Sequence, residues 1–333
     1  MTELEPAEAR PRSGVRDVAR VAGVSTQTVS RVINGHANVR PETRERVLEA
    51  MSELGYRVNN AARSLGTRTT RTLGVIASDA TLYGPSAGIA ALEAAARAVG
   101  RWIATAYATA TSTESMLEAA ERLLDQGVDG LIILAPHTAT LSALTAAYPF
   151  IPLTALHTGV GAARQEEGAA LAARHLVALG HRRIAHLAGP EDWVETTARD
   201  AGVDGALASA GLELVARWRG DWSAASGAAA APAIAKAISS ETAPTAIIVA
   251  NDQMALGLIG GLRSVGLDVP QRVSITGFDD NADAAFYVPP LTTVRLDLAG
   301  EAQRAIISAL GESDPPLPGA PLLVSRGSTA PLD

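Results

Sequence analysis

Residues 17–34 read DVARVAGVSTQTVSRVIN. Apolar residues recur at helical spacing on both sides of Gly23, and Ser25 is placed to cap the amides of a second helix that runs to about Ile33. So short a connection between two helices predicts a helix-turn-helix. The alternative is a surface helical hairpin whose polar residues are merely solvated, and the length of the whole stretch argues against it.

The second of these helices has an apolar and a polar side. Val29, Val32 and Ile33 should face inward. The opposite side would then be free to enter a DNA major groove, where Gln suits adenine and Arg suits guanine. The residues that this spacing exposes are Thr26, Gln27, Ser30 and Arg31.

A third amphipathic segment follows the two helices. Pro41 is suited to a first helical turn and Gly55 to a stop. We expect three helices to close a small core, in which the inward side of the third is formed by Val47, Leu48, Met51 and Leu54.

Charge separates this region from the rest of the chain. Between Arg12 and Arg71 there are eleven arginines and five acidic residues, a net charge of +6, whereas the whole chain carries −7 and the remainder −13. A basic segment attached to an acidic body provides phosphate contacts while limiting general adhesion to DNA.

Residues 17–34, together with RPETRERV at 40–47, resemble the DNA-binding headpiece of the LacI/GalR family of transcriptional regulators. Residues 59–65, NNAARSL, resemble the family's hinge helix, which folds on operator DNA and inserts a leucine pair into the minor groove. Val58 replaces the proline that is usual before this hinge, so the free hinge is either looser or unaffected. The expected DNA-binding residues are Ser25, Thr26, Gln27, Thr28, Ser30, Arg31, Asn34, Asn38, Asn59, Ala62 and Leu65.

Composition indicates a soluble protein with more than one domain. The chain has 333 residues, 47% of them hydrophobic, and no cysteine, which excludes disulfides and thiol catalysis. We see no signal peptide and no uncharged apolar run of about 20 residues, and we therefore expect a cytoplasmic protein. Residues 1–13 lack apolar periodicity and are expected to be a flexible tail.

After residue 71 the pattern changes to short apolar runs separated by helical segments. This alternation predicts an α/β core with parallel sheets in two lobes. The predicted strands are 73–77, 130–134, 151–156, 183–188, 246–250 and 273–277. The predicted domains are a headpiece at 14–58, a hinge and linker at 59–71, and a core at 72–330, with lobe 1 at about 72–168 plus 297–323 and lobe 2 at about 169–296 plus 324–330.

Polar residues follow several predicted strands, where ligands bind in open α/β sheets. In the pairs Asn251-Asp252 and Asp279-Asp280, we expect the first residue to contact ligand and the second to cap the next helix. The six histidines are scattered without metal-ligand spacing, and no phosphate-binding glycine loop is present, so neither a metal nor a cofactor is expected.

Three further segments resemble the galactoside-binding members of the same family, and the likeness extends from about Val15 to Leu323. The segments are GDWSAASG at 220–227, VANDQMALG at 249–257 and PPLTT at 289–293. The resemblance implies that Arg199, Trp222, Asn251 and Asp279 hold a sugar, with Ser78 and Leu82 on the opposite wall. Chemically, an indole provides a flat face for a pyranose, and the polar side chains bond its hydroxyls.

His157 stands where those relatives have an aspartate, and the segment 158–164 is shorter than theirs. His157 either contacts the ligand or lies in an exposed loop, and the effector can differ from a galactoside.

These observations predict a dimeric repressor on a pseudo-palindromic operator, released by a sugar. The helix from Ser86 to Val99 either forms part of the dimer interface or belongs to the core, and without a C-terminal heptad helix no tetramer is expected. Rival functions are a family member with a purine or other corepressor, a regulator that uses a partner protein, and a sugar-transport protein. A hydrolase is disfavoured because the G-x-S-x-G match at 84–88 begins several residues after a strand.

Overall fold

The computed structural model describes residues 13–34, 36, 38–56, 69–78, 81–134 and 136–332. The chain divides into two compact units, Met1–Thr70 and Arg71–Asp333. Most of the expected N-terminal tail and the expected hinge contacts Asn59, Ala62 and Leu65 lie outside the described residues.

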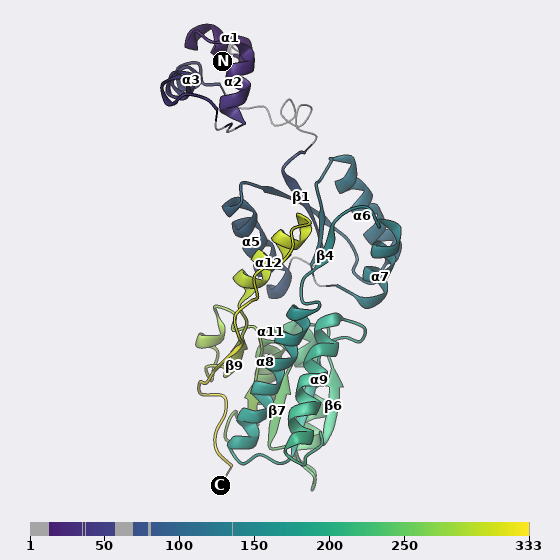
Figure 1. The fold of residues 1–333 in the computed structure, drawn as a ribbon. Helices are drawn as coiled ribbons and strands as arrows, with labels where there is room; N and C mark the ends of the chain where they lie inside the picture. The colour runs from purple at the N-terminus through teal and green to yellow at the C-terminus, as the bar shows by residue number, and fades with distance from the viewer. Residues whose placement is uncertain are drawn as a thin grey trace, which may run out of the picture. The chain divides into compact units, whose positions relative to one another are not determined.

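The first unit contains three helices, α1 (Val15–Ala22), α2 (Thr26–Ile33) and α3 (Pro41–Glu53) (Figure 1). Gly23 ends α1 in the left-handed conformation with φ 64°, and Ser25 Oγ caps α2 by accepting a 3.1 Å hydrogen bond from the Thr28 amide. Val18, Val29 and Val47, one from each helix, are fully buried in the shared core. The predicted helix-turn-helix is confirmed.

Leu48 is a correction to the predicted core of this unit. We expected it to face inward, but it is 53% exposed. Helix α3 instead packs through Val47 and Ala50, three residues apart, and a residue directly after Val47 is turned about 100° away around the helix.

The second unit begins with a four-stranded parallel sheet of order β2-β1-β3-β4. Its strands are β1 (Thr72–Ala77), β2 (Trp102–Tyr107), β3 (Leu131–Leu134) and β4 (Leu153–Ala155). The connecting helices are α5 (Tyr83–Ala98), α6 (Thr113–Asp125) and α7 (Thr138–Ala147).

A second parallel sheet repeats this arrangement in the order β6-β5-β7-β8. Its strands are β5 (Ile184–Ala188), β6 (Ala216–Arg219), β7 (Ala246–Val249) and β8 (Ser274–Thr276). The helices of this half are α8 (Val160–Ala178), α9 (Val194–Ser209), α10 (Ala224–Ile238) and α11 (Asp252–Ser264), with a 3₁₀ turn at Ala284–Phe286. The predicted α/β core with parallel sheets is confirmed.

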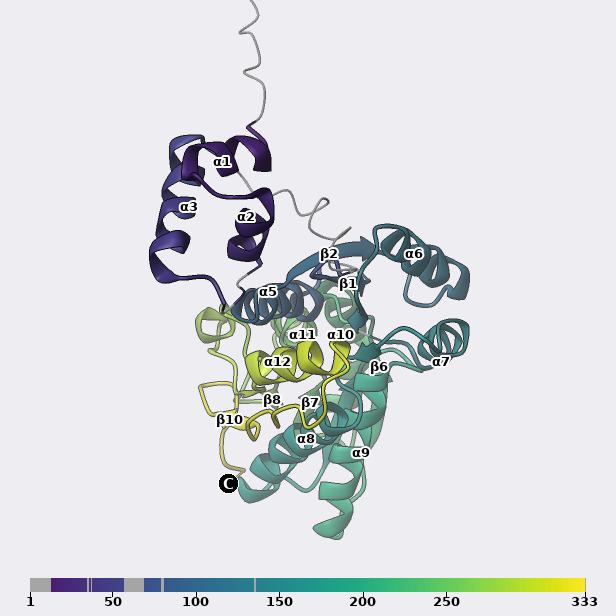
Figure 2. The same cartoon turned by 45° about the horizontal axis from the view of Figure 1, so that its top comes forward.

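The chain crosses between the two halves more than once. Helix α8 begins at Val160 and packs on α9, so the first crossing comes before residue 160, earlier than the expected boundary at 168. Strand β9 (Thr293–Arg295) pairs antiparallel with β10 (Leu322–Val324). Between them α12 (Leu298–Ala309) returns to the first sheet and packs against α5 (Figure 2).

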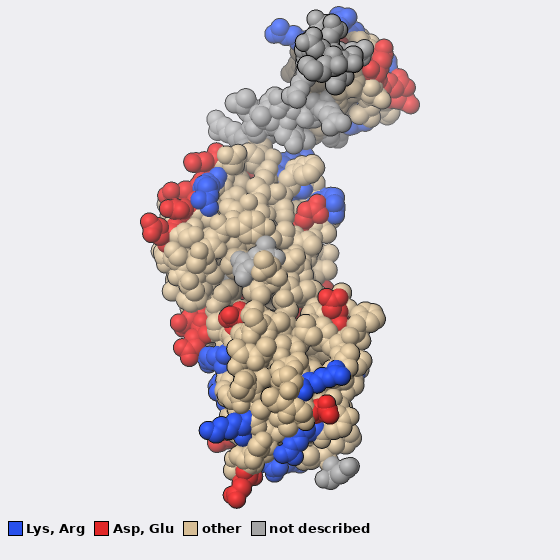
Figure 3. All heavy atoms as spheres, turned by 180° about the vertical axis from the view of Figure 1, so that it is seen from behind, with Lys and Arg blue, Asp and Glu red and all other residues tan. Residues whose placement is uncertain are grey.

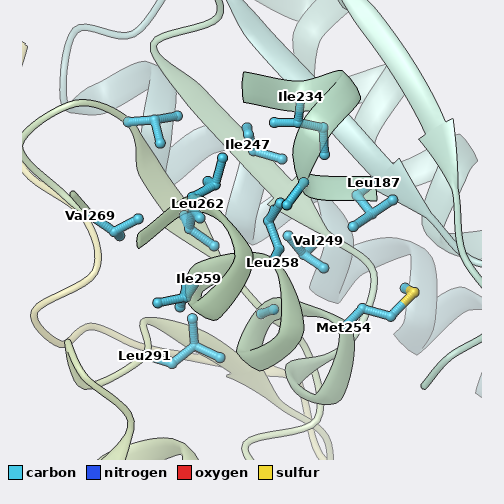
Figure 4. Packing of buried hydrophobic residues seen from close by; sticks show 14 of the residues in the cluster. Leu187, Ile234, Ile247, Val249, Met254, Leu258, Ile259, Leu262, Val269 and Leu291 are labelled. Atoms are coloured by element: carbon cyan, nitrogen blue, oxygen red, sulfur yellow. The ribbon is translucent and has the colours of Figure 1, made fainter. Parts of the chain in front are cut away.

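The core of the second half is built from aliphatic side chains of β5, β7, α10 and α11 (Figure 4). Helices α10 and α11 approach closely, because Gly257 lies against the Ala224 carbonyl, where a Cβ would collide with the oxygen. The alanine-rich segment at 227–232 forms part of α10. Within the described residues, no helix has the length and apolarity needed to cross a membrane.

All six predicted strands are present, but β2, β6, β9 and β10 were missed. Strands β2 and β6 occupy sheet edges, and none of their residues is fully buried. They therefore lack the continuous buried apolar run of a central strand. We also expected a helix from Ser86 to Val99, whereas α5 begins three residues earlier, at Tyr83, and Ser86 lies within it. Because Ser86 lies inside this helix, it does not occupy the strand-to-helix turn that a nucleophile elbow requires.

Candidate functional site

The first candidate site is the polar surface of α2. Thr26, Gln27, Ser30 and Arg31 are all exposed, while Val29 and Val32 are buried on the other side. A helix that presents such residues beside its N-terminus can enter a major groove. The surface is therefore arranged as the sequence predicted.

Other predicted DNA-binding residues have structural partners within this unit. Ser25 Oγ lies 2.9 Å from Thr28 Oγ1 as well as capping the helix, and Asn34 Nδ2 donates to Ser30 Oγ over 3.4 Å. Asn38 is exposed. On the face of the core unit shown in Figure 3, acidic and basic side chains are interspersed, so that face presents no basic patch for a nucleic acid.

The second candidate site is a cavity of about 420 Å³ in the core unit. Its walls come from residues that follow the carboxyl ends of strands in both sheets, the position at which open α/β sheets bind ligands. The segment after β1 contributes Leu82, Tyr83 and Pro85, the end of β3 contributes Leu134, and the start of α12 contributes Leu298 and Ala299. This wall is largely apolar.

Arg199, on α9, organises the opposite wall. Its Nε donates to Gln165 Oε1 over 2.8 Å, one Nη donates to the Ala250 carbonyl, and the other donates to Asp279 Oδ1 over 3.2 Å. The guanidinium carbon lies 3.8 Å from the centroid of the Phe278 ring and 5.4 Å from that of Trp222. These contacts give Arg199 a fixed orientation in the cavity wall.

Two indoles stand beside this arginine. The ring centroids of Trp193 and Trp222 are 6.2 Å apart with an interplanar angle of 76°, an edge-to-face pair. The Trp222 indole lies directly against Gly189, where a Cβ would collide with the ring. The cavity thus has one indole face rather than two parallel ones.

The Asn251-Asp252 pair corrects the sequence prediction. Asn251, not Asp252, is the N-cap of α11, since its Oδ1 accepts from the Met254 amide over 2.8 Å, and its Nδ2 donates to the Trp222 carbonyl over 2.9 Å. Asp252 is instead buried and accepts from Thr293 Oγ1 over 2.5 Å and from the Asn281 amide over 2.8 Å. Asn251 still lines the cavity, and it also holds the backbone that carries the indole.

Asp280 also differs from its predicted role as a helix cap. Its carboxylate binds Arg295 at 2.5 Å and Arg326 at 2.6 Å. No α-helix begins directly after it, because the chain continues into the 3₁₀ turn at Ala284–Phe286. Asp280 is therefore held in an ion-pair cluster at the edge of the cavity.

Burial shifts the acid strength of several groups here. Desolvation raises the pKa of Asp252 to about 8 and that of Asp279 to about 6, in the second case against the stabilising charge of Arg199. It also raises the pKa of Glu195 to about 7 and lowers that of His157 to about 4. The imidazole at residue 157 is consequently neutral near pH 7, able to accept or donate a hydrogen bond.

His157 lies at the crossing between the two halves. Its backbone amide donates to Glu301 Oε1 over 2.9 Å, and Arg304 Nη2 holds the same oxygen over 2.8 Å. His157 therefore lines the cavity and does not lie in an exposed loop.

The backbone around the cavity adopts an uncommon conformation. Among the described non-glycine residues, seven have positive φ, and four of these line the cavity, with φ of 60° at His157, 74° at Trp222, 105° at Asp279 and 49° at Asp280. Such conformations cost free energy and cluster at binding sites.

Helix α9 is fixed to the sheet beneath it by a polar network. His186, in β5, places Nδ1 2.9 Å from the Ile248 carbonyl and Nε2 3.1 Å from Asp200 Oδ1, and Arg219 binds the other oxygen of that carboxylate at 3.1 Å. Burial opposes ionisation of Asp200, but these donors hold its pKa below the ordinary value. Asp200 directly follows Arg199, so the network positions the helix segment that carries the arginine.

Six of the seven predicted effector residues line one cavity: Leu82, His157, Arg199, Trp222, Asn251 and Asp279. Ser78, the seventh, is buried at the end of β1 and does not line it. Sequence reasoning missed Gln165, Glu195 and Arg295, which lie on the cavity wall. Gln165 and Glu195 sit within helices rather than directly after strands, so they had no positional signal.

Comparison with family models identifies both units. The model described as bacterial regulatory proteins, lacI family, matches residues 15–59, and the model described as periplasmic binding protein-like domain matches residues 173–329.

Individual relatives match most of the chain. The lactose operon repressor of Escherichia coli (strain K12) is 38% identical over 288 residues, 84% of this chain and 79% of the relative. The HTH-type transcriptional repressor PurR of Pasteurella multocida (strain Pm70) is 32% identical over 302 residues, 88% of this chain and 89% of the relative.

Solved structures show the same architecture. The lac repressor dimer bound to operator and the anti-inducer ONPF superposes with a TM-score of 0.81 at 35% identity, covering 96% of this chain and all of that one. A complex of the transcriptional regulator CelR with cellobiose gives a TM-score of 0.66 at 28% identity, covering 95% of this chain and all of that one.

Proposed function

The chain belongs to the lacI family of bacterial regulatory proteins and is a DNA-binding transcriptional repressor. We propose that a small saccharide, a galactoside or a related sugar, binds in the core cavity and releases the repressor from operator DNA. The observation that carries the proposal is the composition of the cavity wall. An indole face lies beside directed polar groups of Arg199, Asn251 and Asp279, opposite an apolar wall. Saccharides combine apolar CH faces with ring hydroxyls, and this wall complements both.

For the DNA side, we propose that two copies bind the half-sites of a pseudo-palindromic operator through residues 14–58, with the hinge at 59–71 between headpiece and core. The exposed polar surface of α2 supports this, as does the likeness to a repressor dimer solved on operator. Arg31 and Gln27 would read base edges, while residues such as Asn38 would contact the backbone or flanking bases.

The geometry of the indoles favours a saccharide over a purine. A purine is held best between two parallel aromatic faces, but Trp193 meets Trp222 edge-on at 76°. A single face suits one side of a pyranose. Likeness to a regulator solved with cellobiose further supports a sugar.

Coupling to DNA would arise because the cavity is bordered by both halves of the core. The Tyr83 amide donates to Gln253 Oε1 over 2.9 Å, and the Thr138 amide donates to the Asp192 carbonyl over 3.0 Å. A ligand that contacts both walls favours one relative position of the two halves. If that position disfavours the operator-bound dimer, sugar and operator weaken each other's binding by the same factor.

Fluorescence anisotropy on a labelled symmetric operator, at fixed salt, tests this function. Methyl β-galactoside, the corresponding glucoside and a purine base are titrated into the repressor–operator complex. Release by a saccharide is the expected result. Tighter operator binding with the purine, or no response to any saccharide, would overturn the sugar assignment and leave the DNA-binding function intact.

The DNA contact is tested separately with Arg31→Ala. We expect a loss of about 1–3 kcal/mol in specific binding and a weaker preference at one base position. Arg46→Ala, an exposed arginine on α3, is the matched control and should keep wild-type base preference. Unchanged discrimination in Arg31→Ala would show that another side chain reads that base.

A further inference from the structure

Glu195 differs from the other acidic residues that line the cavity. It lies in the first turn of α9, its residue exposure is 6%, and its Oε2 has no hydrogen-bond partner within the described structure. A buried carboxylate oxygen without a partner is costly, and such a group in a ligand cavity indicates a position that ligand completes.

Each of the other lining carboxylates has at least one partner within the protein. Arg199 holds Asp279, and Arg295 and Arg326 hold Asp280. Asp297 caps α12 by accepting from the Gly300 and Gly319 amides over 2.9 and 2.8 Å. None of these three depends on a ligand in the way that Glu195 does.

Gln165 carries the complementary unsatisfied group. It is fully buried on α8, where its Oε1 accepts from Arg199 and its Nε2 has no partner within the described structure. Helices α8 and α9 pack against each other, and both side chains line the same cavity. The wall therefore presents one unfilled acceptor, at Glu195, and one unfilled donor, at Gln165.

The charges of the wall narrow the class of ligand. The two arginines that line the cavity, Arg199 and Arg295, are each paired with an aspartate. Arg326 shares Asp280 with Arg295, so three arginines stand against four lining carboxyl groups, those of Glu195, Asp279, Asp280 and Asp297. An anionic ligand would therefore meet an excess of acidic groups. A hydroxyl satisfies both unfilled groups, since it donates and accepts, and an ammonium satisfies the carboxylate.

We propose that Glu195 and Gln165 are a specificity-determining pair that requires a hydrogen-bond donor on the saccharide opposite Glu195 and rejects saccharides that carry an anionic group such as a phosphate ester. The proposal rests on the proposed function, because it concerns the ligand of the same cavity. The donor is a ring hydroxyl or an ammonium, and a neutral sugar and an amino sugar distinguish the two.

Isothermal titration calorimetry on the full-length protein tests the pair with methyl β-galactoside, galactose 6-phosphate and galactosamine. We expect wild-type protein to bind the phosphate ester at least about 30-fold more weakly than the neutral sugar. Glu195→Gln should weaken neutral-sugar binding about 10-fold and narrow the difference between neutral and phosphorylated sugars. Gln165→Glu, which keeps the acceptor for Arg199 but removes the free donor, should weaken binding similarly.

Glu191→Gln is the matched control, since it removes the same charge from an exposed residue that pairs with Arg219 near the start of the same helix. It should bind every sugar like wild type. A pH series adds a second readout. Sugar affinity should rise through pH 7 in wild-type protein as Glu195 ionises, and it should rise less in Glu195→Gln. The charged groups that face Glu195 are Arg199 and Asp279.

A preference for galactosamine that disappears in Glu195→Gln would identify the donor as an ammonium, and equal binding of the two sugars would identify a hydroxyl. Wild-type affinity of Glu195→Gln for all three sugars, or equal wild-type binding of neutral and phosphorylated sugar, would overturn the pair while leaving the saccharide function standing. Failure of every saccharide to bind wild-type protein would overturn the proposed function itself.

Discussion

The two parallel sheets of the core have matching strand orders, β2-β1-β3-β4 and β6-β5-β7-β8, yet they supply opposite walls of the cavity. The first half contributes mainly apolar side chains, such as Leu82 and Leu134. The second contributes Glu195, Arg199 and Asp279. The fold therefore determines where the cavity lies, and the residues after the strands determine what it can bind.

The interiors of the two halves differ in the same way as the two cavity walls, one being more apolar and the other more polar. Strand β3 of the first sheet is entirely apolar and buried, whereas β5 of the second carries His186 in a polar network with Asp200. The second half also buries two acids, Glu195 and Asp252. If this contrast reflects a division of roles, substitutions in the first half should mainly affect stability and those in the second should mainly affect ligand binding.

The largest expected effect is on stability, from Ile132→Ala in the centre of β3. Its side chain is fully buried, so the substitution should lower the free energy of unfolding by about 4 kcal/mol. Chemical denaturation measures this, with the exposed Val265→Ala as the control. Folded Ile132→Ala should bind sugar within about threefold of wild type, and a larger loss would show that the first sheet does more than support the wall.

Asp279→Asn should have the largest effect on ligand binding. It removes the carboxylate that orients Arg199 and that we propose to bond the sugar. We expect about a 100-fold loss of affinity, or about 2.7 kcal/mol. Operator binding without sugar should be unchanged. Calorimetry measures the sugar affinity and anisotropy measures the operator binding. Asp268→Asn, at an exposed aspartate, is the control. Normal release of Asp279→Asn by sugar would remove this residue from the site.

Leu82→Ala tests the apolar wall. Loss of its side chain should weaken sugar binding about 10-fold, because apolar contacts in a pocket contribute less discrimination than buried hydrogen bonds. The measurement is the same titration, with Leu317→Ala as an exposed control. A loss equal to that of Asp279→Asn would contradict the division between an apolar and a polar wall.

The smallest expected effect is a pH dependence of stability. Asp252 has its pKa raised to about 8, so the folded state holds its proton over a pH range in which the unfolded state has lost it. The free energy of unfolding should therefore fall as pH rises from about 5 to 8. Asp252→Asn should flatten this slope in denaturation series, and an unchanged slope would assign it to other groups.

The helix-turn-helix was predictable because its information is local. Helical spacing, the stop at Gly23 and the cap at Ser25 all lie within 18 residues, and each is found where expected. Central strands were predictable for a similar reason, since burial on both faces leaves a continuous apolar run. Edge strands β2 and β6 contain no fully buried residue, so they leave no such run.

The cavity was predictable in location but not in all its chemistry. Gln165 and Arg199 are 34 residues apart and meet only because α8 packs on α9, so no sequence spacing shows their hydrogen bond. The helix cap was assigned to Asp252 instead of Asn251 in the prediction, because an Asn and an Asp are equally good helix caps. Asp252 does not cap the helix because its carboxylate bonds Thr293 and Asn281 instead.

The positive φ values at His157, Trp222, Asp279 and Asp280 change how these positions should be probed. At most sites alanine is the neutral replacement, but here an alanine removes the side chain and still pays for a left-handed backbone. Glycine removes the side chain and relaxes that backbone. The difference in stability between the alanine and glycine variants of one position, corrected for the greater entropy of an unfolded chain with glycine, thus measures the free energy cost of the left-handed backbone there.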